Sequence, residues 1–95
     1  DMASQTFSFS AGTEEQTSTA VTVGAGEKLR VRFTGKGVPP NVDAYLKIVA
    51  NATTTFVHIG EKYAWVTAAV AESDSCSVFC DNIGGDAVAG IIETF

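Results

Sequence analysis

Leu29-Arg30-Val31-Arg32-Phe33-Thr34 is the stretch that decides the fold class of this chain. Apolar and polar residues alternate strictly along it, and a period of two is typical of a β-strand with one buried face. We therefore expect Leu29, Val31 and Phe33 to point into a core, while the two arginines face solvent or a partner.

The residues before this stretch predict its neighbour. Thr19-Ala20-Val21-Thr22-Val23 also alternates, and the short segment Gly24-Ala25-Gly26-Glu27 joins the two runs. Two alternating runs linked by a short glycine-containing loop are the pattern of a β-hairpin. The sequence therefore predicts that residues 19–23 and 29–33 pair with each other.

The same alternation recurs along the rest of the chain. Clusters of Gly, Pro, Asn, Asp and Ser separate the alternating runs, as turns do. The expected strands are residues 6–10, 19–23, 29–34, 43–50, 55–59, 63–67, 76–80 and 87–95. About eight short strands separated by turns predict an all-β fold, a small antiparallel β-sandwich or flattened barrel. We expect residues 1–95 to form it as a single domain, with Leu46, Ile48 and Val78 also in the core.

The longest expected loop is residues 35–41, Gly-Lys-Gly-Val-Pro-Pro-Asn. Two glycines and a Pro-Pro pair oppose regular strand pairing. We expect the chain to cross between sheets here, and loops of this kind often carry function.

The composition bears on partners. Only 18% of the 95 residues are charged, the net charge is −5, and the hydrophobic share is 45%. About 25% charged residues is typical, so much of this surface must be Ser, Thr, Ala and Gly. Such a surface favours close contact with another protein or a second copy, and a neutral soluble monomer is the alternative.

The same composition argues against two classes of partner. The six basic residues are scattered along the chain, whereas nucleic acid or an anionic membrane surface calls for a basic patch. No run of about 18 apolar residues indicates a transmembrane helix, and no signal peptide is visible. We interpret Met2-Ala3-Ser4 as a native start preceded by one residue, and removal of a signal or pro-segment before Asp1 is the alternative.

Cys76 and Cys80 are the only cysteines. In one extended strand they share a face but lie roughly 13 Å apart, whereas a disulfide needs Cα atoms within about 7 Å. We expect two reduced, half-buried thiols on one strand face; a local disulfide, which would need a turn at residues 77–79, is the alternative. With His58 as the sole histidine, they do not make a zinc site.

No residue pattern indicates catalysis. A nucleophilic triad would place His58 beside a nucleophile and a carboxylate, and no Gly-x-Ser-x-Gly elbow is present. We expect a hydrogen-bonded strand histidine and no enzymatic activity or cofactor. Asp74, Asp81 and Asp86, with Asn82, could supply oxygen ligands to calcium, but their spacing is not that of an EF-hand and turn chemistry explains them.

Aromatic residues supply the best candidates for contact. Tyr45, Tyr63 and Trp65 are the aromatic residues expected at the surface, and the last two lie on one strand face. Such a pair could stack on a sugar ring or anchor a protein interface, although Trp65 could instead fill the core. The expected interface residues are Tyr63, Trp65, Lys36, Val38 and Asn41.

Residues 29–92 carry a series of short motifs that resembles a known class of proteins. The motifs are Leu46-Lys47-Ile48-Val49, Asn51-Ala52-Thr53, Phe56-Val57-His58-Ile59-Gly60, Val66-Thr67-Ala68-Ala69, Glu72-Ser73-Asp74-Ser75, Val78-Phe79 and Ala87-Val88-Ala89-Gly90-Ile91. In them the chain is similar to small β-rich virion structural proteins of tailed bacteriophages, which are poor in Lys and lack catalytic residues. It departs from them in carrying two cysteines where a Pro-Gly step is expected, and in extending further at the N-terminus. The resemblance implies a head-decoration or head-fibre role, often as a trimer.

Two hypotheses about function follow. The first is a virion-surface assembly module that docks a Ser/Thr/Ala-rich β face onto a larger protein assembly and onto copies of itself. The second is a secreted carbohydrate-binding or lectin-like module that uses the face of Tyr63 and Trp65, with calcium from Asp81 and Asp86.

Overall fold

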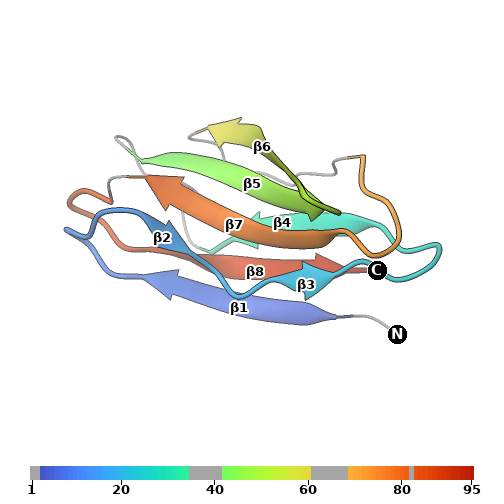
Figure 1. Ribbon diagram of the computed structural model, residues 1–95. Helices are drawn as coiled ribbons and strands as arrows, with labels where there is room; N and C mark the ends of the chain where they lie inside the picture. The colour runs from blue at the N-terminus through green and yellow to red at the C-terminus, as the bar shows by residue number, and fades with distance from the viewer. Residues whose placement is uncertain (1–2, 35–41, 61–68, 82) are drawn as a thin grey trace.

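The structure, a computed structural model, describes residues 3–34, 42–60, 69–81 and 83–95. Within these residues the chain forms eight β-strands and no helix. The strands lie in two antiparallel sheets that face each other (Figure 1). The all-β sandwich expected from the alternating sequence is therefore confirmed.

The smaller sheet has three strands in the order β1-β8-β4. Their bounds are Ser4–Phe9, Val88–Thr94 and Leu29–Phe33. In the larger sheet β7 has β5 and then β6 on one side, while β2 and β3 pair with successive parts of its other edge. The bounds of β7, β5, β6, β2 and β3 are Ser75–Asp81, Asp43–Ala50, Thr53–Gly60, Gln16–Thr17 and Val21–Thr22.

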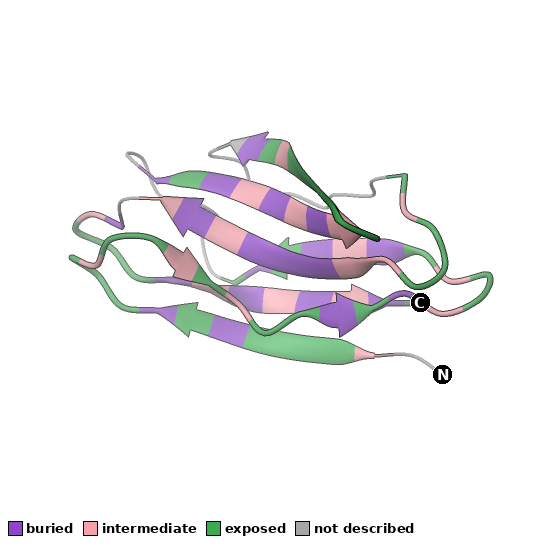
Figure 2. Cartoon of the chain, in the orientation of Figure 1, coloured by how far each residue is buried: buried purple, intermediate pink, exposed green. Residues whose placement is uncertain are grey.

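The core lies between the sheets and is lined by alternate residues of the longer strands, most regularly in β4, β5 and β8. Figure 2 shows buried residues alternating with less buried ones along β4, β5 and β8. The six residues expected in the core, Leu29, Val31, Phe33, Leu46, Ile48 and Val78, are all buried. A residue of this kind gains about 1.5–3 kcal/mol from full burial, which explains why the alternation fixes the inward face of each strand.

The strand pairing is nested. The first strand pairs with the last, β2 and β3 pair with β7, and β5 pairs with its successor β6. Pairing that folds an antiparallel chain back over itself in this way is the topology of a jelly roll. It brings the two ends of the sequence side by side, because β1 and β8 are neighbours (Figure 1).

The predicted hairpin between residues 19–23 and 29–33 is wrong. A tight turn does join them, with the Glu27 N–H donating to the Gly24 carbonyl at 3.1 Å and Gly26 at φ +73°. However, β3 pairs with β7 and β4 pairs with β8, so the turn passes from one sheet to the other. Alternation specifies which face of a strand is buried but not which strand lies beside it.

Other boundaries differ in detail. The expected strand 19–23 is paired only at Val21–Thr22, and Gln16–Thr17, which lies outside the expected strands, forms β2. The expected strand 63–67 and loop 35–41 lie outside the described residues. Because β4 and β5 belong to different sheets, the chain does change sheet between Phe33 and Asp43, as the loop composition predicted.

Both cysteines are free, and both point into the core from β7. The expectation of reduced thiols on one strand face is confirmed, and the alternative of a local disulfide is wrong. They are fully rather than half buried, because β7 is an inner strand whose inward face is covered by the opposite sheet.

Candidate functional site

The outer face of the five-stranded sheet carries four aromatic rings in mutual contact. Phe79 of β7 and His58 of β6 lie directly opposite Tyr45 of β5, and Phe56 lies two residues from His58 on β6, opposite Lys47. The Tyr45 ring centroid lies 5.0 Å from His58, 6.0 Å from Phe79 and 6.2 Å from Phe56. Phe56 and Phe79 lie 5.6 Å apart. We call these four residues the aromatic cluster.

The period of the strands explains why the rings gather here. Residues 44, 46 and 48 of β5 are buried against the core, so Tyr45 and Lys47 must point outward. Directly opposed residues of antiparallel strands share a face, which places Phe79 beside Tyr45 and Phe56 beside Lys47. Phe56 is 51% exposed, the most exposed large apolar side chain of the described residues.

Two carboxylates, those of Asp43 and Asp81, border one end of the cluster. Asp43 lies directly opposite Asp81 on the neighbouring strand, two residues beyond the pair of Tyr45 and Phe79. Like charges directly opposite each other destabilise a sheet. The His58 Nε2 lies 3.6 Å from the Asp43 Oδ1, in a pair in which both side chains are more than half exposed. This end of the face is therefore negative and would accept a positive charge.

An open hollow of about 380 Å³ lies over the cluster and is lined by Glu15, Tyr45, Phe56, Phe79 and Asp81. Three apolar rings and two carboxylates line it. Its volume is within the range of small-ligand sites, about 300–1,000 Å³. Because carboxylates only accept hydrogen bonds when ionised, the hollow suits a group that brings donors or positive charge together with a flat apolar surface.

Lys47 lies at the other end of the same face. It is two residues beyond Tyr45 on β5 and directly opposite both Ser77 and Phe56. The outer face therefore runs from carboxylates at Asp43 and Asp81, through aromatic rings, to a cation at Lys47.

The two thiols are not placed to act at this face. Cys76 and Cys80 point to the opposite, inner side of β7. Burial raises the pKa of Cys80 to about 12, and burial together with the negative charge of Asp74 raises the pKa of Cys76 to about 11. At neutral pH both are therefore protonated, and a thiol is a weak nucleophile in that form.

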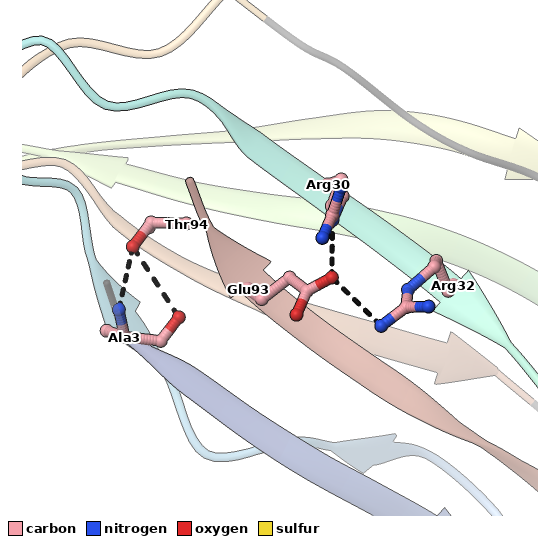
Figure 3. Close-up of polar contacts among 5 residues, drawn as sticks. All are labelled: Ala3, Arg30, Arg32, Glu93 and Thr94. Atoms are coloured by element: carbon pink, nitrogen blue, oxygen red, sulfur yellow. Dashed lines mark hydrogen bonds and ion pairs between the residues drawn. The ribbon is translucent and has the colours of Figure 1, made fainter.

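The other sheet carries a separate polar network on its outer face (Figure 3). The Glu93 Oε1 accepts hydrogen bonds from the Arg30 Nε and lies 3.1 Å from the Arg32 Nη2. The Arg30 guanidinium also lies 4.5 Å above the Phe95 ring. These arginines, expected to face solvent or a partner, are thus held by Glu93 of β8.

The five expected interface residues, Tyr63, Trp65, Lys36, Val38 and Asn41, lie outside the described residues. Asp81 lines the hollow, Asp86 is exposed in a turn, and Asp74 accepts a hydrogen bond from the Ala71 N–H at 2.9 Å. Among the described residues no group of three His, Cys, Asp or Glu side chains could hold a metal ion. Asn82, the remaining candidate for calcium, is not described.

The sequence analysis selected Tyr45 but missed its partners. It described His58 only as a hydrogen-bonded strand histidine and Phe56 only as part of an expected strand. Neither strand alternates clearly between apolar and polar residues, so the sequence gives no signal that places Phe56 and Phe79 on the outer face. Their contact with Tyr45 depends on strand register, which the pattern of each separate strand does not contain.

Comparisons with known proteins give no relative for this chain. No family model, no curated protein and no solved structure matches it. No helix of the described residues is long and apolar enough to span a membrane.

Proposed function

We propose that this chain is a non-enzymatic docking module that associates with copies of itself and with a larger protein assembly. The virion surface of a bacteriophage, where it would act as a decoration or fibre protein, is the setting that we propose. The observation that carries the proposal is the exposed aromatic cluster on the outer face of the five-stranded sheet.

The energetics of the cluster support a covered state. A large aromatic side chain buries about 150–250 Å² when it is fully enclosed, and Phe56 retains half of its exposure. Covering that remainder is worth about 2 kcal/mol at about 25 cal/mol per Å². Aromatic residues are also the usual anchors of protein interfaces.

The topology is compatible with the proposed setting. Jelly rolls are common in viral capsid domains and also in lectins. A fold does not by itself specify a function, so the choice of a virion rests on the resemblance of the sequence motifs to those of phage structural proteins and on the low share of charged residues.

The proposal is tested by light scattering coupled to size-exclusion chromatography, at loading concentrations from about 10 to about 500 µM. We expect the mass of the unmodified chain to rise above that of a monomer over this range, and Phe56→Ser to shift the rise to higher concentration. Phe95→Ser is the matched control, because Phe95 is also an exposed phenylalanine, at 41%, but lies beside Arg30 of the other sheet. A monomer at every concentration would contradict self-association.

The aromatic hollow supports one other candidate, a carbohydrate-binding module. Aromatic rings stack on the apolar faces of sugars, and the carboxylates of Glu15 and Asp81 could accept hydrogen bonds from sugar hydroxyls. A glycan array probed with the chain and with Tyr45→Ala tests it. Binding that Tyr45→Ala abolishes would favour this function over docking to protein.

A further inference from the structure

We infer that the partner of the outer face is a second copy of the same face, packed antiparallel so that Lys47 of each copy meets Asp43 and Asp81 of the other. The inference rests on the proposed self-association and adds the surface, the symmetry and the charge pairs that it uses.

The order of groups along β5 carries this inference. Asp43, Tyr45 and Lys47 point to the same side of β5, with the aromatic residue midway between opposite charges. Asp43 and Lys47 are about 13 Å apart along the strand, at about 3.3 Å per residue. The outer face therefore has a negatively charged end and a positively charged end, and the two ends are about equally distant from Tyr45.

A two-fold axis that lies between two such faces, and crosses the strands at Tyr45, reverses the strand direction of the second copy. It therefore brings Lys47 of each copy over Asp43 of the other, while the aromatic rows meet in the middle. The interface is isologous, as two-fold interfaces must be, and each charge pair occurs twice.

The same arrangement relieves the repulsion within each copy. Asp43 and Asp81 are directly opposed on neighbouring strands, and a lysine ammonium between them would neutralise part of their charge. The four-carbon stem of lysine can adapt to the twist between stacked sheets, about 30° when their strands are aligned. The arginines of this chain are not available in this way, because Glu93 holds both of them.

The size of the face predicts a weak association. Four strand positions about 4.8 Å apart and eight residues of about 3.3 Å give roughly 500 Å² per copy. The total of about 1,000 Å² is at the lower limit for specific protein interfaces. A dissociation constant in the micromolar range is therefore expected, and the stoichiometry is two, not the three that is frequent in the phage proteins that the chain resembles.

Charge reversal with mixing tests the inference, measured by sedimentation equilibrium at low salt. Lys47→Glu replaces the cation at one end of the face with a carboxylate, and Asp43→Lys replaces the Asp43 carboxylate at the other end with a cation. We expect each variant alone to dimerise more than about tenfold more weakly than the unmodified chain, because both charge pairs become repulsive. Mixed in equal amounts, the two variants should form a heterodimer, because both pairs between positions 43 and 47 across the interface are then of opposite sign.

The control is Lys28→Glu, which makes the same change of net charge at an exposed lysine outside this face. It should leave dimerisation unchanged. Circular dichroism and melting temperature establish that each variant is folded. If the unmodified chain dimerises but the two variants do not associate with each other, the inferred interface is wrong and self-association stands. A monomeric unmodified chain would overturn both, and dimers that survive Lys47→Glu would place the interface on another surface.

Discussion

Ser18 and Val78 exchange two hydrogen bonds between the edge segment β2–β3 and the inner strand β7. The Ser18 N–H donates to the Val78 carbonyl at 2.9 Å, and the Val78 N–H donates to the Ser18 Oγ at 2.9 Å. A side-chain oxygen thus takes the place of a backbone carbonyl at the point where the strand pairing is interrupted. It keeps a buried N–H satisfied between β2 and β3.

Ser18→Ala should therefore destabilise the fold, because it leaves the Val78 N–H without this acceptor. The expected loss in the free energy of unfolding is about 1–2 kcal/mol, measured by urea denaturation. Ser8→Ala, at an exposed position of β1, is the control and should change stability by less than about 0.5 kcal/mol. Equal effects of the two substitutions would contradict the role of the hydroxyl.

Gly90→Ala should be among the most damaging single substitutions. A Cβ at Gly90 would collide with the Arg32 carbonyl oxygen and come within 2.8 Å of the Phe7 Cζ. Because β8 is paired on both edges, its backbone cannot move away. We expect thermal denaturation to show that the free energy of unfolding falls by about 3 kcal/mol or more. Gly85→Ala, where an added Cβ meets nothing within 4 Å, should be nearly neutral in the same thermal denaturation experiment.

Glu93→Gln should weaken the three-stranded sheet by about 1 kcal/mol. It removes the charge to which Arg30 and Arg32 are both paired, and the Glu93 side chain is only 14% exposed. Glu14→Gln, an exposed carboxylate, provides the comparison. We expect the difference between the two variants to shrink in about 1 M salt, where exposed charges are screened. A difference that is independent of salt would mean that packing, not charge, is what Glu93 contributes.

The buried thiols should make the protein less stable in alkaline solution. Because the pKa of Cys76 and Cys80 in the folded chain is about 11 and about 12, folding favours the protonated thiols. The contribution of the protonated thiols to the free energy of unfolding is complete below pH 9.0, the pKa of a cysteine in the unfolded chain. It is lost as the pH rises above that value. Between pH 8 and pH 10 the loss is about 1 kcal/mol per thiol.

Urea denaturation at pH 8, 9 and 10 measures this effect against the double variant Cys76→Ala/Cys80→Ala. The variant is expected to be less stable at pH 8, because cavities replace the thiols, but to show a shallower decline with pH. Parallel declines would show that other groups cause the alkaline loss. Iodoacetamide at pH 8 should modify neither thiol in the folded chain and both in urea.

The inward and outward faces of the strands could be read from the sequence because hydrophobic burial acts on each strand separately. Leu29, Val31 and Phe33 are buried as expected. The partners of each strand could not be read in the same way. The tight turn at Gly24-Ala25-Gly26-Glu27 fits a hairpin and a crossing between sheets equally well by its sequence, and only packing of both runs against the whole core decides between them.

The candidate site was predictable to a smaller extent for the same reason. Tyr45 could be selected as an exposed aromatic residue, but its cluster joins β5 to Phe56 and Phe79 from two other strands. Each of these phenylalanines alone is a good strand former, so its sequence context does not distinguish a core position from the surface. Register across three strands is what gathers the rings, and that register depends on contacts distant in the sequence.

The place of β8 between β1 and β4 sets the order in which the molecule can mature. It follows every other strand in the chain, yet it supplies the hydrogen-bonding partner for the first. While the polypeptide is being made, Phe7 and Phe9 must remain uncovered until residues 88–94 emerge, and pairing over such sequence distances is slow. The three-stranded sheet can therefore be completed only once residues 88–94 are available to pair with both of its other strands.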